Sequence, residues 1–229
     1  MSAEVIQPVV FGGPSLSDER SAHFTWRPPA VRGDFDALAD ATVVYIDSYM
    51  WQCPTLTHVE ILAFLRRGGT LIGASSAGAL RAVELRNCGA IGVGYVYGAI
   101  LSGRIVDDGE LLAAVDVDTL RPLTVPLVDV RHLLALMRGA LRHDLLLRML
   151  DVARRLYFME RTRYVLLKEW NILDSDACRI AAQILATKGW SIKEKDSNLA
   201  LKFARARMKD SHALPDPLPC RLDDVLVLD

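Results

Sequence analysis

Residues 70–85 read TLIGASSAGALRAVEL, an apolar run followed at once by a turn of small residues and then by a helical pattern. This order of strand, tight turn and helix is typical of an elbow that lifts a nucleophilic side chain clear of a sheet edge. The elbow needs small residues two positions before and two positions after the nucleophile, and Ala74 and Gly78 stand there around Ser76. The stretch therefore predicts Ser76 as a nucleophile.

Two other interpretations of this turn stay open. Ser75, flanked by Gly73 and Ala77, meets the size requirement loosely. A serine before a helix is also a common N-cap, in which case Ser76 is a structural residue. In the catalytic interpretation, the backbone N–H of Ala77 at the start of the helix is a candidate donor to an oxyanion.

The first half of the chain alternates apolar runs with helical patterns. The runs cover residues 9–11, 41–46 and 70–72, and they are continuous, as is typical of strands buried on both faces. Thr55 or Thr57 is expected to cap the helix that precedes the third run. Strands separated by single helices predict an α/β fold with an open, mainly parallel sheet and flanking helices.

Three regions are expected along the chain. Residues 1–130 are predicted to form the α/β core that contains the elbow. Residues 131–213 are rich in leucine at helical spacing and are predicted to form a helical appendage. Residues 214–229 contain three prolines and are expected to form an extended tail.

In an open parallel sheet, ligands bind beyond the carboxyl ends of the strands, and three loops are expected there. The first loop offers the backbone N–H groups of Gly12 and Gly13 as oxyanion donors and Ser15 as a substrate-binding residue. Ser15 or Ser17 is also expected to cap a short helix. The second loop covers residues 47–57, and the third is the serine turn of the elbow.

A histidine is the natural candidate for the base that would deprotonate Ser76. His58 is preferred because it lies in the first turn of the helix after the second loop, and its spacing from apolar residues predicts that it faces the sheet. Asp47, at the end of the preceding strand, is expected to orient its ring. His132 is the alternative base, because it follows a strand-like run at residues 128–132.

The remaining polar candidates lie on the elbow helix and in one acidic turn. Arg81 and Glu84 are three residues apart and are expected to form a helical ion pair. Together with Ser75 and Ala77, they complete the set of candidate substrate-binding residues. The acidic turn at residues 107–110 has no second set of ligands, so no metal site is expected. No phosphate-binding glycine motif is present, and no cofactor is expected.

Composition argues against several classes of protein. The net charge is −1, which does not favour a nucleic-acid partner, and the four cysteines are too scattered for a disulfide framework or a C-x-x-C metal site. No apolar stretch approaches the roughly 18 residues of a membrane span, so a cytoplasmic protein is expected. Residues 121–229 carry 19 Lys and Arg against 14 Asp and Glu, with Arg154 and Arg161 among them. This excess predicts a docking surface for an acidic partner, with ordinary solvated helix faces as the alternative.

Four segments of the first half together resemble the TfuA-like proteins, in the order and spacing of that family. They are FGGPSL at 11–16, RPPA at 27–30 with Gly33 and Asp34, HVEIL at 58–62 and GASSAGALRAVEL at 73–85. Three positions depart from the family pattern. The usual Ser-Met-Gly is Ser-Ala-Gly here, the usual Asp-Gly after the second strand is Asp47-Ser48, and the acidic triplet is interrupted by Gly109.

The resemblance implies a role in peptide backbone thioamidation beside a YcaO-type enzyme, which activates an amide with ATP while the TfuA-like protein helps to supply sulfur. Joined to the elbow, this role predicts a serine hydrolase that releases sulfide from a thiocarboxylated sulfur-carrier protein of the ThiS type. The alternatives are a non-catalytic adaptor that binds the YcaO enzyme or its peptide substrate, and a small peptidase, because the elbow also resembles that of peptidase E.

Overall fold

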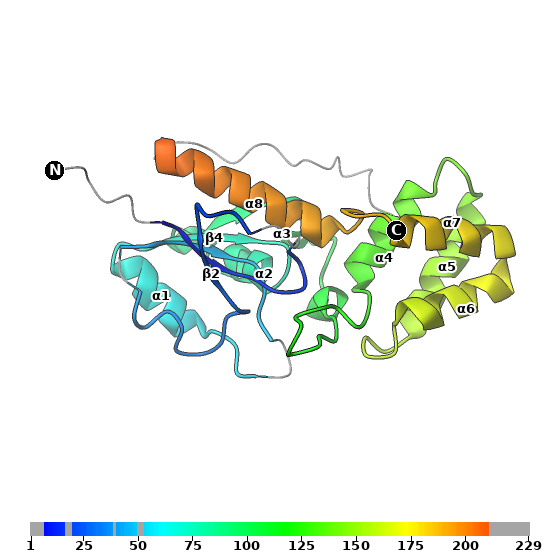
Figure 1. The fold of residues 1–229 in the computed structure, drawn as a ribbon, viewed down its shortest axis with the longest axis horizontal. Helices are drawn as coiled ribbons and strands as arrows, with labels where there is room; N and C mark the ends of the chain where they lie inside the picture. The colour runs from blue at the N-terminus through cyan, green and yellow to red at the C-terminus, as the bar shows by residue number, and fades with distance from the viewer. Residues whose placement is uncertain (1–6, 17–19, 39, 50–52, 211–229) are drawn as a thin grey trace.

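Five short strands form one parallel sheet in the structure, a computed structural model that describes residues 7–16, 20–38, 40–49 and 53–210 (Figure 1). The strands are β1 (Val9–Phe11), β2 (Thr25–Arg27), β3 (Thr42–Tyr45), β4 (Thr70–Ala74) and β5 (Ile91–Val93). They are hydrogen-bonded in the order β2-β1-β3-β4-β5, and every neighbouring pair is parallel. The predicted α/β fold with an open parallel sheet is confirmed.

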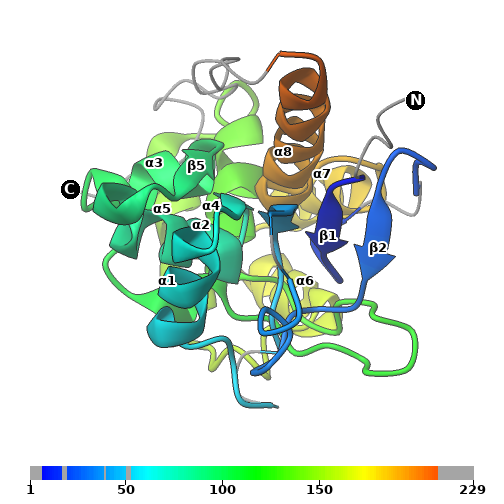
Figure 2. The ribbon, with the colours of Figure 1, turned by 90° about the vertical axis from the view of Figure 1, so that its left-hand side faces the viewer.

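Helices cover both faces of this sheet, so strand residues are buried whichever way they point. One face packs against α1 (His58–Arg66) and α2 (Ala77–Glu84), and the other packs against α8 (Ile192–Lys209), as Figures 1 and 2 show. The first face contains Val9, Phe11, Val43, Tyr45 and Leu71. The second face contains Val10, Val44, Ile46 and Ile72. Burial on both sides explains why the strand sequences are continuous apolar runs.

Helix α1 begins and ends where local sequence signals predict. Of the two candidate caps, Thr57 is the one used: its hydroxyl accepts a hydrogen bond from the backbone N–H of Glu60 at 3.2 Å. The carboxylate of Glu60 accepts from the backbone N–H of Thr57 at 2.9 Å, which completes a capping box. The glycine pair at residues 68–69 follows the last helical turn.

A second core lies beside the sheet and is purely helical. It is formed by α4 (Leu127–Leu136), α5 (His143–Arg155), α6 (Arg163–Leu173) and α7 (Ser175–Leu185). Trp170 is fully buried at its centre, and its indole N–H donates to the backbone carbonyl of Met149 at 2.9 Å. The helices expected after residue 130 are therefore present, but α8 leaves this core and packs on the sheet.

Three short helices lie between α2 and α4 in the chain. They are α3 (Tyr95–Leu101) and the 3₁₀ helices η1 (Arg86–Cys88) and η2 (Asp108–Leu111). Among the described residues, no helix is both long and apolar enough to cross a bilayer.

Three local expectations differ from the structure or fall outside it. Residues 128–132 belong to α4 and not to the expected strand. The sequence suggested a strand because this helix is buried on nearly all sides, so its apolar residues show no helical period. In place of the helix expected after Ser15, residues 13–16 and 22–24 form turns and bends, while residues 17–19 lie outside the described part. The tail expected at residues 214–229 also lies outside the described residues.

Arg161 is a structural residue and not part of a basic surface. It is buried, and its guanidinium donates to the backbone carbonyls of Ala153 and Leu156, each at 3.0 Å. Burial lowers the pKa of this guanidinium from its usual value. These bonds satisfy carbonyls at the end of α5, so the expected docking surface for an acidic partner cannot include Arg161.

One buried carboxylate on α8 ties this helix to the N-terminus of α3. Asp196 is fully buried and accepts hydrogen bonds from the backbone N–H groups of Tyr95 and Val96, at 2.8 and 2.7 Å. Burial raises the pKa of Asp196 to about 7, against the lowering effect of these two bonds. The carboxylate fits because Gly94, with φ of 96°, has no side chain in the space that it occupies.

We predict that Gly94→Ala destabilises the protein far more than Gly89→Ala. Both glycines have φ near 97°, but Gly89, with ψ of 5°, is left-handed, where a β-carbon costs about 1–2 kcal/mol. Gly94, with ψ of 177°, is in a region open essentially to glycine alone, where the strain is about 1–3 kcal/mol. A β-carbon at position 94 would lie 2.4 Å from the carboxyl carbon of Asp196, whereas one at position 89 has no neighbour within 4 Å. Overpacking should add about 1–3 kcal/mol at position 94 alone. Urea unfolding measures both losses, and equal losses would contradict the role given to Asp196.

Candidate functional site

The candidate site lies between β1 and β3, where the order in which the chain adds strands to the sheet reverses. From β1 the chain moves to β2 on one side, and then to β3 on the other side. The loops that follow β1 and β3 therefore leave the sheet next to each other and in diverging directions, which opens a crevice beyond the carboxyl ends of the strands. The serine turn follows β4, the next strand along the same edge.

The serine turn has the tight geometry expected of an elbow. The backbone N–H of Ser76 donates to the carbonyl of Ala74 at 2.8 Å, which closes a three-residue turn around Ser75. Ser75 accordingly has φ of 68°, a left-handed conformation that costs a non-glycine residue about 1–2 kcal/mol. Ser76 is the N-cap of α2, although its side chain makes no capping hydrogen bond.

Gly78 explains why α2 can begin so close to the sheet. A β-carbon on this residue would lie 1.7 Å from the backbone oxygen of Tyr45, at the end of β3. Its backbone N–H donates to the carbonyl of Ile46 at 3.2 Å. Only glycine permits this approach, so the first turn of α2 rests directly on the end of β3.

Backbone strain and exposure favour different serines as the nucleophile. Ser75 carries the positive φ, as a nucleophile on a strained turn would, but it is 0% exposed and its hydroxyl has no partner among the described residues. Ser76 is 4% exposed and lines a cavity of about 20 Å³ with Asp47 and Lys193. Because a nucleophile must reach its substrate, the cavity favours Ser76.

Asp47 organises the loop after β1 and does not orient a histidine. Its buried carboxylate accepts hydrogen bonds from the backbone N–H groups of Gly13 and Ser15, at 2.9 and 3.0 Å, and from the Ser15 hydroxyl at 2.7 Å. The backbone N–H of Gly12 donates to the carbonyl of Arg27 at 3.3 Å. The N–H groups of Gly12 and Gly13 thus already have acceptors, which corrects their expected role as oxyanion donors.

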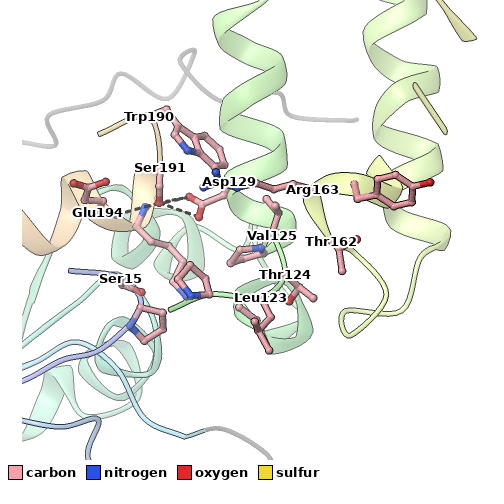
Figure 3. Close-up of a pocket in the computed structure, with 16 residues that line it drawn as sticks. Ser15, Leu123, Thr124, Val125, Asp129, Thr162, Arg163, Trp190, Ser191 and Glu194 are labelled. Carbon is pink, nitrogen blue, oxygen red and sulfur yellow. Dashed lines mark hydrogen bonds between the residues drawn. The ribbon is translucent and has the colours of Figure 1, made fainter. Parts of the chain in front are cut away.

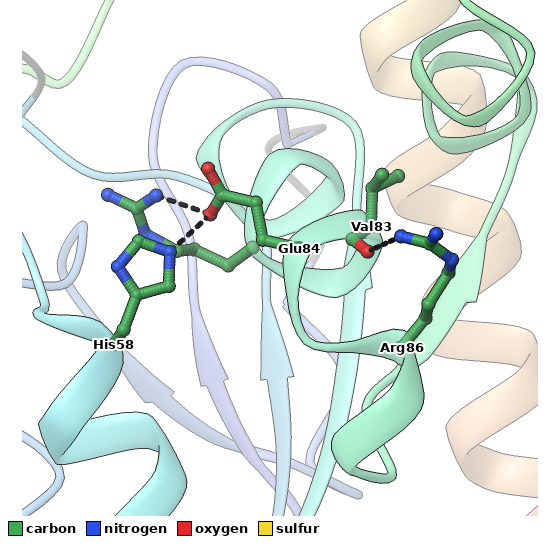
Figure 4. A network of polar contacts seen from close by, with 5 residues as sticks. His58, Val83, Glu84 and Arg86 are labelled. Carbon is green, nitrogen blue, oxygen red and sulfur yellow. Dashed lines mark hydrogen bonds and ion pairs between the residues drawn. The ribbon is translucent and has the colours of Figure 1, made fainter.

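His58 belongs to a surface network at the opposite end of α2 from Ser76 (Figure 4). Its Nε2 lies 2.8 Å from Oε2 of Glu84, and the same carboxylate forms the expected ion pair with Arg81. Glu84 lies eight residues beyond Ser76, a rise of about 12 Å along the helix. The side chain of His58 is 49% exposed. The expectations that it faces the sheet and pairs with Asp47 are therefore wrong.

The alternative base and the acidic turn are also engaged elsewhere. His132 is buried in α4, and its Nε2 lies 2.9 Å from the ammonium of Lys195. In the acidic turn, Glu110 forms a buried, bidentate ion pair with Arg131, at 2.8 and 2.9 Å. Asp107 accepts a hydrogen bond from the backbone of the same turn. The pair of Glu110 with Arg131 thus joins this turn to α4.

Lys193 is a candidate site residue that sequence reasoning did not identify. It lies in the first turn of α8, is 4% exposed, and lines the cavity at Ser76. Its ammonium donates to the backbone carbonyl of Leu111 at 3.0 Å. Only tertiary packing brings α8 to this edge of the sheet, and a lysine at a helix start carries no sequence signal of its own.

The buried carboxylate of Asp129 lies close to Lys193 and is well supplied with donors. It accepts hydrogen bonds from the Ser191 hydroxyl at 2.8 and 2.9 Å and from the backbone N–H of Lys193 at 3.2 Å. Burial raises the pKa of Asp129, while the charge of Lys193 acts in the opposite direction. The carboxylate thus supports the positive charge at the wall of the cavity.

Two buried serines of the site give a matched test of this geometry. Ser15→Ala removes a hydroxyl that donates to a buried carboxylate, so it should cost about 1.5–3 kcal/mol. Ser75→Ala removes a buried hydroxyl without a partner among the described residues, so the free energy of unfolding should not fall and should rise by up to about 1–3 kcal/mol. Urea denaturation of both variants tests the difference. A large loss in Ser75→Ala alone would reveal a partner for that hydroxyl and reverse the two assignments.

One family of known proteins matches the part of the chain that contains the candidate site. The family model of the TfuA-like proteins matches residues 47–162, which run from Asp47 through the serine turn and α2 to the N-cap of α6. No curated protein matches the chain at the threshold applied. TfuA-like proteins have an accessory role in thioamidation, associated with a YcaO partner. Because the match covers just over half of the 229 residues, the chain belongs to the TfuA-like family.

Proposed function

We propose that this protein supplies sulfur for thioamidation by releasing sulfide from a thiocarboxylated carrier protein of the ThiS type, with Ser76 as the nucleophile. The observation that carries the proposal is the position of Ser76: it starts α2 at the carboxyl edge of the sheet and lines a cavity whose wall includes the ammonium-bearing Lys193. A thiocarboxylate is an anion, and a buried cation beside the nucleophile suits such a substrate.

The reaction balances without a separate base. The Ser76 hydroxyl adds to the thiocarboxylate carbon, the carbon–sulfur bond breaks, and the hydroxyl proton leaves with the sulfur as hydrosulfide. Water then attacks the acyl-serine, which returns Ser76 and releases the carrier with an ordinary carboxylate and one proton. Hydrosulfide formed beside a YcaO-type enzyme would attack the amide that the enzyme has activated with ATP.

Each remaining group of the site has a defined role in this proposal. The backbone N–H of Ala77, in the first turn of α2, would stabilise the oxyanion, since the first N–H groups of a helix have no acceptor within the helix. Lys193 would neutralise the substrate anion. Asp47 would hold the loop after β1 in position, and His58 with Arg81 and Glu84 would stabilise the protein surface.

A second candidate function is a non-catalytic adaptor that binds and activates the YcaO enzyme. The small volume of the Ser76 cavity, about 20 Å³, favours it, because this is room for about one water molecule. Large apolar side chains on the helical core are also exposed, among them Tyr164 and Ile172 of α6, and these suit contact with another protein.

We predict that Ser76→Ala abolishes sulfide release from a purified thiocarboxylated carrier, by about a thousandfold or more, because it removes the nucleophile. Ser75→Ala is the matched control and should retain release, since Ser75 is not among the residues that line the Ser76 cavity. Sulfide is measured directly by a colorimetric assay. Loss of release in Ser75→Ala with normal release in Ser76→Ala would transfer the nucleophile to Ser75.

A rescue experiment separates the hydrolase from the adaptor. In a complete thioamidation reaction with the YcaO enzyme, ATP and peptide, Ser76→Ala should be inactive with the carrier as sulfur source and active with added sulfide. If the protein is an adaptor, the Ser76→Ala variant should stay active with the carrier as sulfur source. If the wild-type protein releases no sulfide from the carrier, the hydrolase proposal is excluded.

We predict that His58→Gln keeps sulfide release within about twofold of wild type. Its partner Glu84 is partly exposed, and a surface pair of this kind contributes little to stability or to a distant site. Inactivity of a folded His58→Gln protein would restore His58 as the base and refute direct proton transfer to sulfur.

A further inference from the structure

Two larger spaces lie near α2, and they differ in their relation to Ser76. The first, of about 350 Å³, lies between the loop after β1 and the helical core (Figure 3). It shares Pro14, Ala113 and Lys193 with the Ser76 cavity, so it belongs to the site already described. The second, of about 400 Å³, is an open groove between α2, α3 and residues 105–111, which we call the α2–α3 groove.

The walls of the α2–α3 groove are mainly apolar. The apolar lining consists of Leu80 on α2, Ile100 on α3, Ile105, Val106 and Leu111. Val106 is 87% exposed, the highest value among the large apolar side chains of the described residues. A single exposed valine is common on protein surfaces, but one at the rim of an apolar groove is typical of a surface that contacts another protein.

The backbone on both sides of Val106 holds this side chain at the surface. Before it, the N–H of Ile105 donates to the carbonyl of Ala99 at 3.1 Å, and the Ile105 side chain is buried. After it, the carboxylate of Asp107 accepts a hydrogen bond from the N–H of Gly109 at 2.8 Å and caps η2. The groove is thus formed before any partner binds, which keeps the entropy cost of binding low.

Carboxylates line the α2–α3 groove together with the apolar side chains, and no Lys, Arg or His belongs to its lining. Glu84 is already occupied by its two basic partners on the surface (Figure 4). Asp107 and Asp108 take part in none of the ion pairs within the described part of the chain. Arg104 is exposed three residues before Asp107 but lies outside the lining. Asp107 and Asp108 therefore present negative charge directly beside Val106.

We propose that the α2–α3 groove docks the YcaO-type enzyme, through a segment of that enzyme in which an apolar side chain is flanked by Lys or Arg. The apolar side chain packs against Ile100 and Val106, and the cations pair with Asp107 and Asp108. The inference rests on the family assignment, which carries the association with a YcaO partner. It holds for a hydrolase and for an adaptor alike.

The position of the groove suits the enzyme better than other occupants. Leu80 lies four residues beyond Ser76 on α2, a rise of about 6 Å, and Leu111 lines both the groove and the Ser76 cavity. An enzyme docked here is therefore close to the point at which hydrosulfide would be released. The chain's own residues 211–229 contain four Asp and one Arg, so charge repulsion disfavours them as the occupant.

The first test measures the affinity of the full-length protein for the purified YcaO-type enzyme by biolayer interferometry. Val106→Lys should weaken binding by about tenfold or more, because it places a cation where an apolar side chain packs. Val117→Lys is the matched control: Val117 is also exposed but lies outside the lining, so this variant should bind as wild type does. Wild-type affinity in Val106→Lys would overturn the proposal.

The second test examines the charges. Asp108→Lys should slow association with the enzyme several-fold at low salt and make the rate less sensitive to salt. Asp118→Lys is its control, because Asp118 is equally an exposed aspartate in a surface turn but does not line the groove. An association rate that is the same in wild type and Asp108→Lys would rule out a basic segment as the occupant.

Other occupants and another surface give different results with the same variants. Analytical ultracentrifugation of the protein alone would reveal a second copy as the occupant, if a dimer of the wild type dissociates in Val106→Lys. Faster tryptic cleavage after Arg221 in Val106→Lys than in Val117→Lys would identify the chain's own C-terminal segment. Weaker binding of the carrier protein in place of the enzyme would identify the carrier. Loss of enzyme binding in Tyr164→Lys, but not in Val106→Lys, would move the contact to α6. Each of these four results would overturn the proposal.

Docking and sulfide release can fail separately in this design. Val106 does not line the Ser76 cavity, so Val106→Lys should release sulfide from the carrier at the wild-type rate. In the complete thioamidation reaction, the same variant should lose activity when the protein is limiting. Docking that depends on Val106 without any sulfide release by the wild type would support the groove and refute the hydrolase. Normal release with docking indifferent to Val106 would support the hydrolase and refute the groove.

Discussion

The candidate site depends on one buried carboxylate, that of Asp47. It accepts three hydrogen bonds from the loop after β1. It thereby joins the ends of β1 and β3, the two strands between which the strand order reverses. Hydrogen bonds to a charged acceptor away from water are strong, and each donor would be costly to leave unpaired in this position. The bonds hold Pro14 and Ser15 against the crevice, where both residues border the spaces next to Ser76.

Helix α8 connects the two cores because one of its faces changes character along its length. Lys193, Asp196, Ala200 and Phe203 follow at spacings of three and four residues, so they share one face. The polar end of this face supplies a cation to the Ser76 cavity and a carboxylate to the start of α3, and the apolar end packs on the sheet. The packing of the apolar end fixes the position of the charged end.

Competition for hydrogen-bond partners explains why the predicted serine, histidine and aspartate do not form one unit. Buried backbone N–H groups require acceptors, and those of Gly13 and Ser15 lie beside Asp47. His58 faces the C-terminal half of α2, where Glu84 is its partner. The spacing of residues in the sequence is compatible with either arrangement, because it does not specify how α1 is positioned relative to α2.

The sequence by itself determined the α/β class, a threonine cap for α1, the strand-turn-helix order around Ser76 and the resemblance to the TfuA-like family. These features depend on contacts between near neighbours in the chain, on small residues at a turn and on apolar runs. Only the tertiary structure decided that Lys193 lies at the Ser76 cavity, that Asp47 binds a loop and that Arg161 is buried. Such contacts join residues tens of positions apart, and they follow from the packing of whole helices on the sheet, which no local pattern records.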